Sequence, residues 1–241
     1  MEAGLQRFSM TATNPHAKTP QSKIPFRLPH PPERRPDDMT SFDHLSATGS
    51  VHHLIQHFGN PDTTLVAGER YMVVCPTRRL AGSHYPDLLV AFGVDPARYK
   101  ASNGYIIEDQ GKPPDFVLEI ASPHTGHIDV GAKRNDYATL AIPEYWRFDE
   151  TGAYHGSRLA GDRLVAGAYE PRPIEELEDG VLQGHSAVLD LRLRWNRGQL
   201  EWHDPATGRH IATFEDERAA RLQAEARARE LEAELRRLRG A

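Results

Sequence analysis

The sequence predicts an α/β protein with a mixed central β-sheet, flanking helices and a long helix near its C-terminal end. Residues 87–92 and 115–121 are near-continuous apolar runs, the pattern of strands buried on both faces. A helical pattern over about 128–140 joins the second run to another apolar run at 145–148. Strand, helix and strand in this order predict a βαβ unit. Turn signals elsewhere favour hairpins, which make the sheet mixed.

Shorter elements precede this unit. Residues 50–58 carry apolar side chains at helical spacing, and the turn-forming run 59–62 ends the expected helix. Strands are expected over 64–66 and 70–74, on either side of an Ala-Gly break, and a weaker strand over 105–108. These elements add strands beside the two buried runs.

The segment after the βαβ unit contains short strands separated by turn signals. Residues 159–164 include a Gly-Asp pair, which predicts a hairpin within that range. Further strands are expected near 188–193 and 200–203, and the run 204–208 predicts another hairpin turn. Antiparallel pairs of this kind accompany the parallel unit, so we expect a mixed sheet.

Composition divides the chain into three parts. Residues 1–45 hold seven of the 18 prolines and only scattered apolar side chains, so we expect a disordered, proline-rich tail. Residues 46–212 carry the core signals and form the predicted folded domain. Residues 213–241 are rich in Ala, Glu, Arg and Leu, which predicts a helical, coiled-coil-like tail.

Two interpretations of this last segment stay open. Leu231, Leu235 and Leu238 follow a/d heptad spacing, with Ala228 and Ala224 one heptad earlier, which is typical of a helical association arm. A solvated helix with many Glu–Arg pairs explains the same composition equally well. A homodimer through this helix, or through the core, is therefore left open.

Charge and composition exclude several classes of protein. The chain has 29 Lys and Arg against 34 Asp and Glu, a formal charge of −5, which excludes a globally basic coat for nucleic acid or membranes. Its one cysteine, Cys75, excludes an intrachain disulfide framework and a cysteine-based zinc site. Because no stretch approaches the roughly 18 apolar residues of a membrane span, we expect a soluble cytoplasmic protein.

Acidic residues within the apolar runs are the first candidates for chemistry. Asp87 precedes the apolar run at 88–92, and Glu119 lies inside the run that Asp115 begins. A carboxylate in a core strand is costly unless it is paired or binds a cation. Acids on two neighbouring strands would suit a Mg²⁺-like ion, which prefers oxygen ligands. A glutamate at a solvent edge, or one paired with arginine, is the alternative.

A lysine follows on the expected helix. Asp129, Lys133 and Tyr137 are spaced i, i+4 and i+8, which places them on one helical face. This helix comes directly after the strand of Glu119, so the Lys133 ammonium is positioned to face the acids and stabilise charge on a phosphate. An ordinary surface ion pair between Asp129 and Lys133 would show the same spacing.

In their order, these residues resemble a known family. The series comprises Pro86-Asp-Leu-Leu-Val90, Pro113-Pro-Asp-Phe-Val-Leu-Glu-Ile-Ala-Ser-Pro123, the helix residues Asp129, Lys133 and Tyr137, and Ile142-Pro-Glu-Tyr-Trp146 with Asp149 following. It is similar to the Uma-type restriction endonucleases of the PD-(D/E)XK nuclease superfamily. The resemblance covers about residues 84–150, with looser similarity over 50–210.

The resemblance implies a restriction-endonuclease-like core and Mg²⁺- or Mn²⁺-dependent hydrolysis of DNA phosphodiester bonds. By position, Asp87 and Glu119 match the metal-binding acids, and the carbonyl of Ile120 matches a further metal ligand. The superfamily lysine usually follows the second acid by two residues, but position 121 is Ala. In this family the lysine comes from the next helix, which matches Lys133. The implied catalytic set is Asp87, Glu119 and Lys133.

Two departures leave a rival interpretation open. Many relatives carry a glutamate on an early helix, but residues 50–58 contain none, and Glu69 is a substitute only by position. The net acidity also argues against tight non-specific DNA binding. A local basic cleft would have to draw on Arg78, Arg79, Lys133, Arg134 and Arg147. The rival is a non-catalytic nucleic-acid-binding or assembly protein that keeps the nuclease fold.

Overall fold

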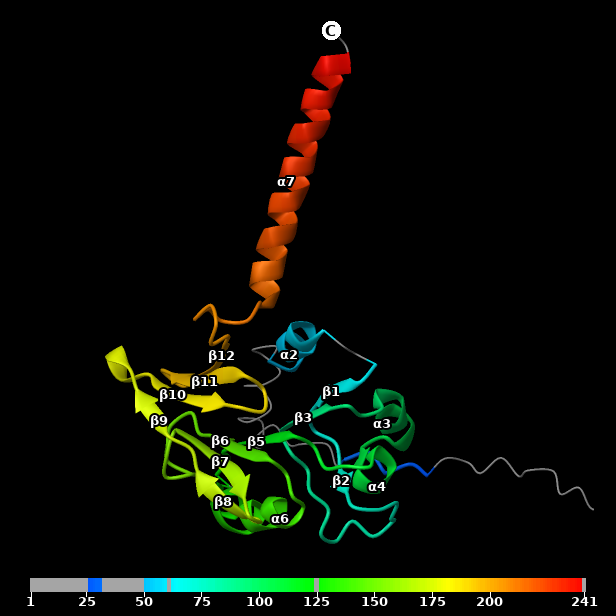
Figure 1. The fold of residues 1–241 in the computed structure, drawn as a ribbon, viewed down its shortest axis with the longest axis vertical. Coiled ribbons are helices and arrows are strands. Elements are labelled where there is room, and N and C mark those ends of the chain that lie inside the picture. The colour runs from blue at the N-terminus through cyan, green and yellow to red at the C-terminus, as the bar shows by residue number, and fades with distance from the viewer. Residues whose placement is uncertain (1–25, 32–49, 60–61, 124–125, 240–241) are drawn as a thin grey trace, which may run out of the picture.

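A mixed β-sheet forms the centre of the molecule (Figure 1). The computed structural model describes residues 26–31, 50–59, 62–123 and 126–239, and within them this sheet has six strands in the order β1-β3-β5-β6-β7-β8. The strands are β1 (Thr64–Ala67), β3 (Leu88–Phe92), β5 (Phe116–Ile120), β6 (Glu144–Phe148), β7 (Leu159–Val165) and β8 (Ala168–Pro171).

The predicted βαβ unit lies in the middle of this sheet. Strands β5 and β6 pair in parallel, whereas the other neighbouring strands pair antiparallel. The connection contains α5 (Gly126–Ile128), a π-helical segment η2 (Asp129–Lys133) and α6 (Arg134–Thr139). The α/β class with a mixed central sheet is therefore confirmed. The helix expected over 128–140 is present, but its first part has π-helical winding.

A second sheet covers one face of the central sheet. It has the order β12-β11-β10-β9, formed by β9 (Ile174–Glu176), β10 (Leu182–Ser186), β11 (Leu191–Asn196) and β12 (Gln199–His203). Side chains from both sheets share one apolar core, to which α2 (Ser50–Phe58) adds Leu54. On β3, Leu88 and Val90 belong to this core, as expected for alternate positions of a strand.

The opposite face of the central sheet packs against helices. Leu89 and Ala91 of β3 and Val117 of β5 belong to a second apolar cluster, together with Tyr137 of α6. The helices α3 (Pro96–Ser102) and α4 (Ile107–Gln110) lie on the β1 side of the molecule in Figure 1. Both faces of the central strands are therefore buried, which explains why their sequences are apolar without alternation.

One expected hairpin is wrong. Residues 159–165 form the single strand β7, and the turn to β8 falls at Ala166 and Gly167, both with positive φ. Gly161 serves packing instead, because a Cβ there would meet the Trp146 ring at 2.8 Å. Gly184 of β10 lies against the same ring, where a Cβ would approach within 2.6 Å. These two glycines let the indole lie between the sheets.

A small parallel pair anchors the described N-terminal residues. Strands β2 (Met72–Val73) and β4 (Tyr105–Ile106) pair, and α4 begins directly after β4, so the strand expected over 105–108 is shorter than predicted. Leu28 is buried against this pair, and its backbone N–H donates to the Ser102 carbonyl at 2.8 Å. Residues 26–31 are thus ordered, contrary to the expected tail.

The rest of the expected tail, 1–25 and 32–45, lies outside the described residues. The division into a tail, a domain over 46–212 and a terminal segment over 213–241 stays a prediction. Helix α7 (Phe214–Arg239) is present over the range with the helical pattern and projects away from the sheets (Figure 1). Within the described residues, no helix combines the length and apolar character needed to cross a membrane.

Candidate active site

Asp87 and Glu119 lie opposite each other on neighbouring strands. The antiparallel register of β3 and β5 pairs Leu88 with Leu118, so the next pair along the ladder is Asp87 and Glu119. Both side chains are buried, and the Asp87 Oδ2 accepts a hydrogen bond from the Ile120 N–H at 2.8 Å. Alternation places both acids on the helical face of the sheet, away from the second sheet.

The Lys133 ammonium reaches this face from η2. Its Nζ lies 2.9 Å from the Glu119 Oε2 and 2.8 Å from the Asp129 Oδ1. The structure thus brings the lysine to Glu119, next to Asp87, whereas Asp115 pairs with Lys112 instead. The same lysine also bridges to Asp129, an acid that the sequence placed on its helical face but did not assign to the site.

The remaining oxygens of Glu119 and Asp129 also have partners. The Tyr137 hydroxyl donates to the Glu119 Oε1 at 2.5 Å, and the His155 Nε2 lies 3.1 Å from the Asp129 Oδ2. The Tyr145 hydroxyl donates to the backbone carbonyl of Asp129 at 2.9 Å. The site is therefore a closed polar network in which both Glu119 oxygens contact protein groups.

Burial dominates the electrostatics of Glu119. Loss of solvent raises the pKa of this carboxyl to about 8; Lys133 lowers the pKa, whereas Asp87 and Asp129 raise it further. Burial works against the charge of Lys133, but the carboxylates of Glu119 and Asp129 outweigh burial and raise the lysine pKa. Lys133 is consequently a permanent cation at neutral pH, whereas Glu119 titrates in that range.

Asp129 shows the opposite balance. Burial raises the pKa of its carboxyl, but the hydrogen bond from His155 and the charge of Lys133 outweigh burial and lower the pKa. Asp129 therefore remains ionised and provides the fixed negative charge that pairs with Lys133.

The π-helical segment η2 explains how one turn supplies two of these groups. A π-helix bonds residue i to i+5 and is wider than an α-helix, and single π-turns are frequent at functional sites. The segment spans Asp129 to Lys133, so both ends of the turn carry side chains of the site. No residue in its sequence signals π winding; the helical periodicity alone predicted an ordinary helix here.

His155 is the buried site residue that the sequence analysis missed. It lies in the loop after β6, where Asp149 orders the backbone: the Asp149 Oδ2 accepts the N–H groups of Tyr154 and His155 at 2.7 and 2.8 Å. The Asp149 Oδ1 accepts two more, from Thr151 and Gly152. Loop residues have no periodicity, so no pattern linked His155 to Asp129.

His84 is a second histidine beside the site. Its ring lies 5.0 Å from the Tyr137 ring, centroid to centroid. Burial lowers the pKa of His84; the Lys133 charge lowers it further, whereas Asp136 raises it. His84 is therefore a neutral imidazole at neutral pH, next to the network. No spacing in the sequence relates His84 to α6, so their proximity could not be predicted.

Glu69, the substitute acid named from the sequence, lies beside the residue that precedes Asp87. The Glu69 N–H donates to the Pro86 carbonyl at 3.1 Å, so its backbone adjoins the residue before Asp87. Gly68 explains this approach, because a Cβ there would lie 2.3 Å from the Asp87 carbonyl oxygen. The backbone of this turn is thus packed directly against that of the acid.

The expected basic cleft does not form from all five cations named above. Arg134 and Arg147 both bind the buried Asp162, each with a shortest distance of 2.8 Å, and Lys133 is paired as described. Arg78 and Arg79 are exposed in the loop between β2 and β3. Three of the five cations are thus paired with carboxylates, and two of the three share one carboxylate. The rule that buried charges are paired accounts for this outcome.

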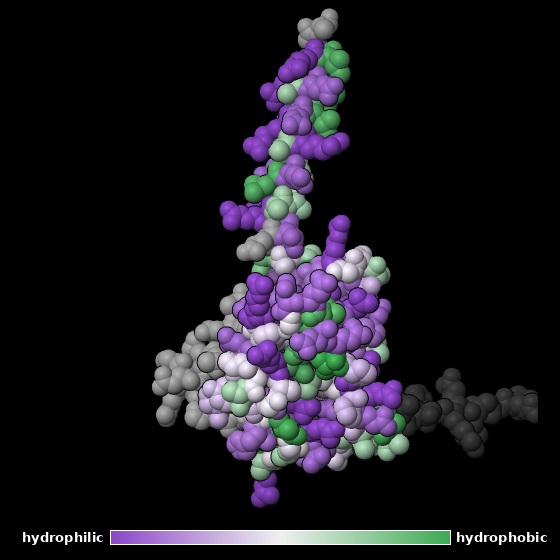
Figure 2. Space-filling view, turned by 90° about the vertical axis from the view of Figure 1, so that its left-hand side faces the viewer, coloured by the Kyte–Doolittle hydropathy of each residue, from purple (hydrophilic) through white to green (hydrophobic). Residues whose placement is uncertain are grey.

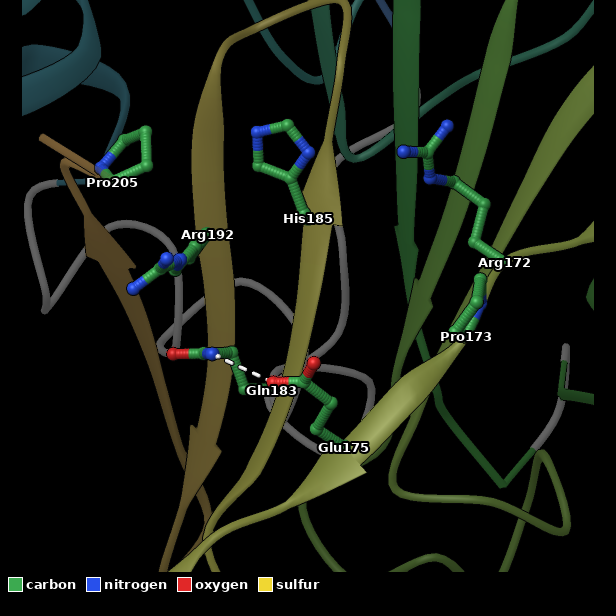
Figure 3. A pocket seen from close by; sticks show the side chains of 7 residues that line it. All are labelled: Arg172, Pro173, Glu175, Gln183, His185, Arg192 and Pro205. Atoms are coloured by element: carbon green, nitrogen blue, oxygen red, sulfur yellow. Dashed lines mark hydrogen bonds between the residues drawn. The ribbon is translucent and has the colours of Figure 1, made fainter.

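Two cavities differ in their relation to the site. A cavity of about 120 Å³ adjoins Ile120 and is lined also by Ala121, Phe148 and Tyr154. A larger one, about 370 Å³, is lined by Arg172, Pro173, Glu175, Gln183, His185, Arg192 and Pro205 (Figure 3). Arg172 of this cavity pairs with Glu144 at the start of β6. Glu119 lies beside Arg147, near the other end of that strand. Among the described residues, neither Asp87 nor Glu119 lines either of these two cavities.

Comparison with known proteins identifies the family. The model of the Uma2 family, described as "Putative restriction endonuclease", matches residues 38–196, well over half of the chain. The chain belongs to the Uma2 family. This confirms the resemblance stated from the sequence, and the match includes every residue of the polar network, from Asp87 to His155.

The other comparisons add little to this Uma2 assignment. No curated protein matches the chain. Among solved structures, the chain is similar to "a putative nuclease belonging to DUF820" from Anabaena variabilis ATCC 29413, with 14% identity and a TM-score of 0.38. That similarity covers 61% of this chain and 72% of the other.

The raised pKa of Glu119 in this Uma2 protein predicts a pH-dependent stability. Between the ordinary value of 4.5 and about 8, the folded protein keeps a proton that the unfolded chain releases. The free energy of unfolding therefore falls as pH rises through this interval. Glu119→Gln should flatten this dependence and make the protein more stable than wild type at pH 9.

Urea denaturation of wild type, Glu119→Gln and the control Glu176→Gln, an exposed strand glutamate, at pH 5, 7 and 9 measures the effect. The control should follow wild type. Parallel curves for wild type and Glu119→Gln would contradict the assignment of a raised pKa to Glu119.

Proposed function

We propose that this protein is a metal-dependent endonuclease that hydrolyses phosphodiester bonds in DNA. The observation that carries the proposal is the Lys133 ammonium, which lies 2.9 Å from Glu119, while Asp87 faces Glu119 across the strand ladder. Membership of a family of restriction endonucleases supports a nuclease; the metal and the DNA substrate are proposed from the chemistry of the site.

The donor set suits Mg²⁺ or Mn²⁺. The Asp87 and Glu119 carboxylates and the Ile120 carbonyl are oxygen ligands of the kind these ions prefer. Asp87 already contacts the Ile120 N–H, so the three proposed ligands are contiguous. Within the described residues, no cluster of three Asp, Glu, His or Cys groups is arranged around a metal position. Backbone and water oxygens would therefore complete the shell.

Each group in the site has a role that its surroundings support. A bound divalent ion would lower the pKa of a water and offset charge on the phosphate. Lys133, held as a permanent cation, orients the attacking water and stabilises the charge that develops on the phosphoryl oxygens. Asp129 and His155 are positioning residues, because Asp129 pairs with Lys133 and His155 in turn contacts Asp129.

Cleavage of plasmid DNA tests the catalytic proposal. Wild type should nick or cut supercoiled plasmid with Mg²⁺ or Mn²⁺ and not with EDTA, whereas Asp87→Asn should lose at least about 100-fold in rate, as expected for loss of a metal ligand. Asp95→Asn is the matched control, since Asp95 only caps α3 and pairs with Arg98 at the surface.

Circular dichroism should show that both variants are folded. The proposal fails if Asp87→Asn and Asp95→Asn cleave equally, or if EDTA leaves the cleavage by wild type unchanged. Branched DNA serves as a second substrate, since the site chemistry acts on the phosphodiester and does not select a DNA shape.

One observation favours the non-catalytic alternative. Both oxygens of Glu119 already contact protein groups, so an ion would have to share this carboxylate with Lys133 and Tyr137 or displace one of them. Calorimetric titration separates the two functions: the enzyme binds Mn²⁺ through a site that Glu119→Gln weakens, whereas the assembly protein binds no ion there. The cytoplasmic location stays a prediction of the sequence.

A further inference from the structure

Helix α7 has a capping motif at its start and basic residues in its last described turn. The Asp216 N–H donates to the Thr213 hydroxyl at 3.2 Å, and the Thr213 N–H donates back to the Asp216 carboxylate at 2.9 Å, which is a reciprocal capping box. Arg236, Arg237 and Arg239 occupy the last turn, where cations complement the helix dipole. The sequence therefore specifies the start of the helix and places favourable charges in its last described turn.

Among the residues that the structure describes, the start of α7 is the part that contacts the rest of the molecule. The Phe214 ring stacks on His52 of α2 at 4.4 Å between centroids, and the Phe214 N–H donates to the His53 Nε2 at 3.0 Å. Beyond this anchor the helix projects from the sheets (Figure 1). Its 26 residues extend about 39 Å at 1.5 Å per residue.

The far part of α7 exposes an apolar seam. Leu231 and Leu235 are 51% exposed and Leu238 is 70% exposed, although side chains of this type are usually buried. Figure 2 shows apolar side chains gathered along one edge of the helix towards its far end. With Leu231 at d, these leucines occupy d, a and d, and Ala224 and Ala228 continue the seam at d and a.

The charges beside this seam identify its occupant. In a parallel, in-register pair of helices, a g residue faces the e residue five positions later on the second helix. Arg227 at g then faces Glu232 at e, and Glu234 at g faces Arg239 at e. Both contacts join opposite charges, and each forms twice in a symmetric dimer. The segment is thus electrostatically complementary to a second copy of itself.

An antiparallel pair lacks this complementarity. If Leu231 faces Leu235 of an antiparallel helix, the two Glu232 side chains lie near each other. The two Glu234 side chains then also lie near each other. Like charges at such positions disfavour that arrangement. Within one helix, Glu232 is 3.9 Å from Arg236 with both side chains well exposed, a weak pair that does not compete with an interhelical contact.

We infer that α7 is a dimerisation arm that binds a second copy of this chain as a parallel, in-register coiled coil over residues 224–239. The inference stands independently of the proposed nuclease activity. Because Phe214 ties the start of each α7 to its own domain, a parallel arm places both domains at the same end of the coil. An antiparallel arm would place them at opposite ends.

Disulfide trapping in the full-length protein tests the arrangement. In a Cys75→Ser background, Leu231→Cys and Leu238→Cys should each form cross-linked dimers on mild oxidation with copper phenanthroline. Ala233→Cys, at the outward-facing f position, is the matched control and should not. Cross-links in a mixture of Leu231→Cys with Leu235→Cys, but not in Leu231→Cys or Leu238→Cys alone, would indicate the antiparallel pair, and no preference over Ala233→Cys would overturn the inference altogether.

Sedimentation equilibrium provides the second measurement. Wild type should be a dimer, Leu235→Lys a monomer, and Glu234→Arg and Arg239→Glu should each dimerise at least tenfold more weakly. Mixing these two charge variants should restore dimers, because opposite charges then face each other at both pairs. A monomeric wild type, or a Leu235→Lys dimer as tight as wild type, would refute the inference.

Discussion

Replacing Lys133 with Met is expected to destabilise the folded protein by about 3–5 kcal/mol at pH 8. The methionine keeps most of the apolar length of the side chain but removes the cation that pairs with Glu119 and Asp129. Both carboxylates are buried, so the variant would contain two adjacent negative charges without a counter-charge. Cleavage of DNA should fall to background in the same variant.

The loss should depend on pH. Without the cation, protons are the means left to neutralise the two acids, so the folded-state pKa of Glu119 rises further and that of Asp129 rises from its lowered value. Folding then takes up protons, and the free energy of unfolding of the variant falls more steeply with rising pH than that of wild type. The difference between the two proteins should shrink as the pH is lowered to 5.

Urea denaturation at pH 5 and 8 measures this effect, with Lys112→Met as the matched control. Lys112 pairs with Asp115 at 2.7 Å, but the Lys112 side chain is 36% exposed. In the variant, water can therefore solvate the Asp115 carboxylate. We expect the control to lose far less stability than Lys133→Met, with no comparable change between the two pH values. Equal losses in the two variants would show that the Lys133 network is not a buried charge cluster.

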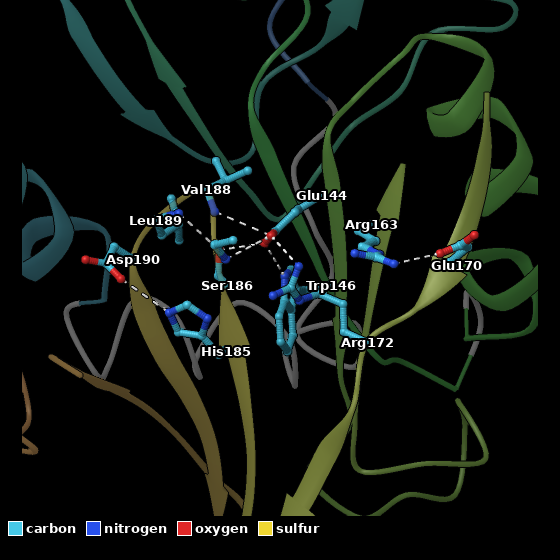
Figure 4. Close-up of polar contacts among 11 residues, drawn as sticks. Glu144, Trp146, Arg163, Glu170, Arg172, His185, Ser186, Val188, Leu189 and Asp190 are labelled. Atoms are coloured by element: carbon cyan, nitrogen blue, oxygen red, sulfur yellow. Dashed lines mark hydrogen bonds and ion pairs between the residues drawn. The ribbon is translucent and has the colours of Figure 1, made fainter. Parts of the chain in front are cut away.

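Glu144→Ala is expected to destabilise the protein by about 3–5 kcal/mol, because it leaves a charge and several hydrogen-bond donors unsatisfied. Glu144 begins β6 and is buried between the sheets, where it accepts hydrogen bonds from the Trp146 indole and the Ser186 hydroxyl (Figure 4). It also accepts the Ala187 N–H and pairs with Arg172 at 3.2 Å. One carboxylate thus joins the two sheets.

A nearby ion pair serves as the control for this prediction. Glu170 of β8 binds Arg163 at 2.9 Å, but both side chains are more than half exposed (Figure 4). Glu170→Ala should therefore cost less than about 1 kcal/mol. Thermal and urea unfolding of both variants gives the comparison. A loss in Glu144→Ala no larger than that in Glu170→Ala would mean that the carboxylate does not join the sheets energetically.

Much of the fold follows from periodicity. The helices over 50–58 and 214–239 match their apolar and charged patterns. The apolar runs at 87–92 and 115–121 contain β3 and β5, and they are apolar without alternation because both faces of these strands are covered. Turn chemistry was less informative. The Gly-Asp pair at 161–162 resembled a hairpin signal, but Gly161 is required by the Trp146 ring that crosses it. A contact between distant residues has no local signature.

Some residues of the candidate site could likewise be predicted from the sequence, and others could not. Asp87, Glu119 and Lys133 were named from the sequence because charges in apolar strands and on the following helix are conspicuous. His155 was not, because it reaches Asp129 through a loop that Asp149 folds with backbone hydrogen bonds. Leu28 was also missed: a single apolar residue among prolines gives no periodicity, yet it is buried beside Ile106.

The π-helical winding of η2 limits how this segment can vary in length. A π-turn amounts to one residue inserted into an α-helix, and each residue turns an α-helix by about 100°. Deleting one residue between Asp129 and Lys133 would restore regular winding and rotate one end of the segment relative to the other. With α6 and the adjoining Lys133 held by their packing, the Asp129 end would turn away from the lysine and their ion pair would be lost. Reading-frame-preserving deletions here would therefore disable the site without unfolding the sheet.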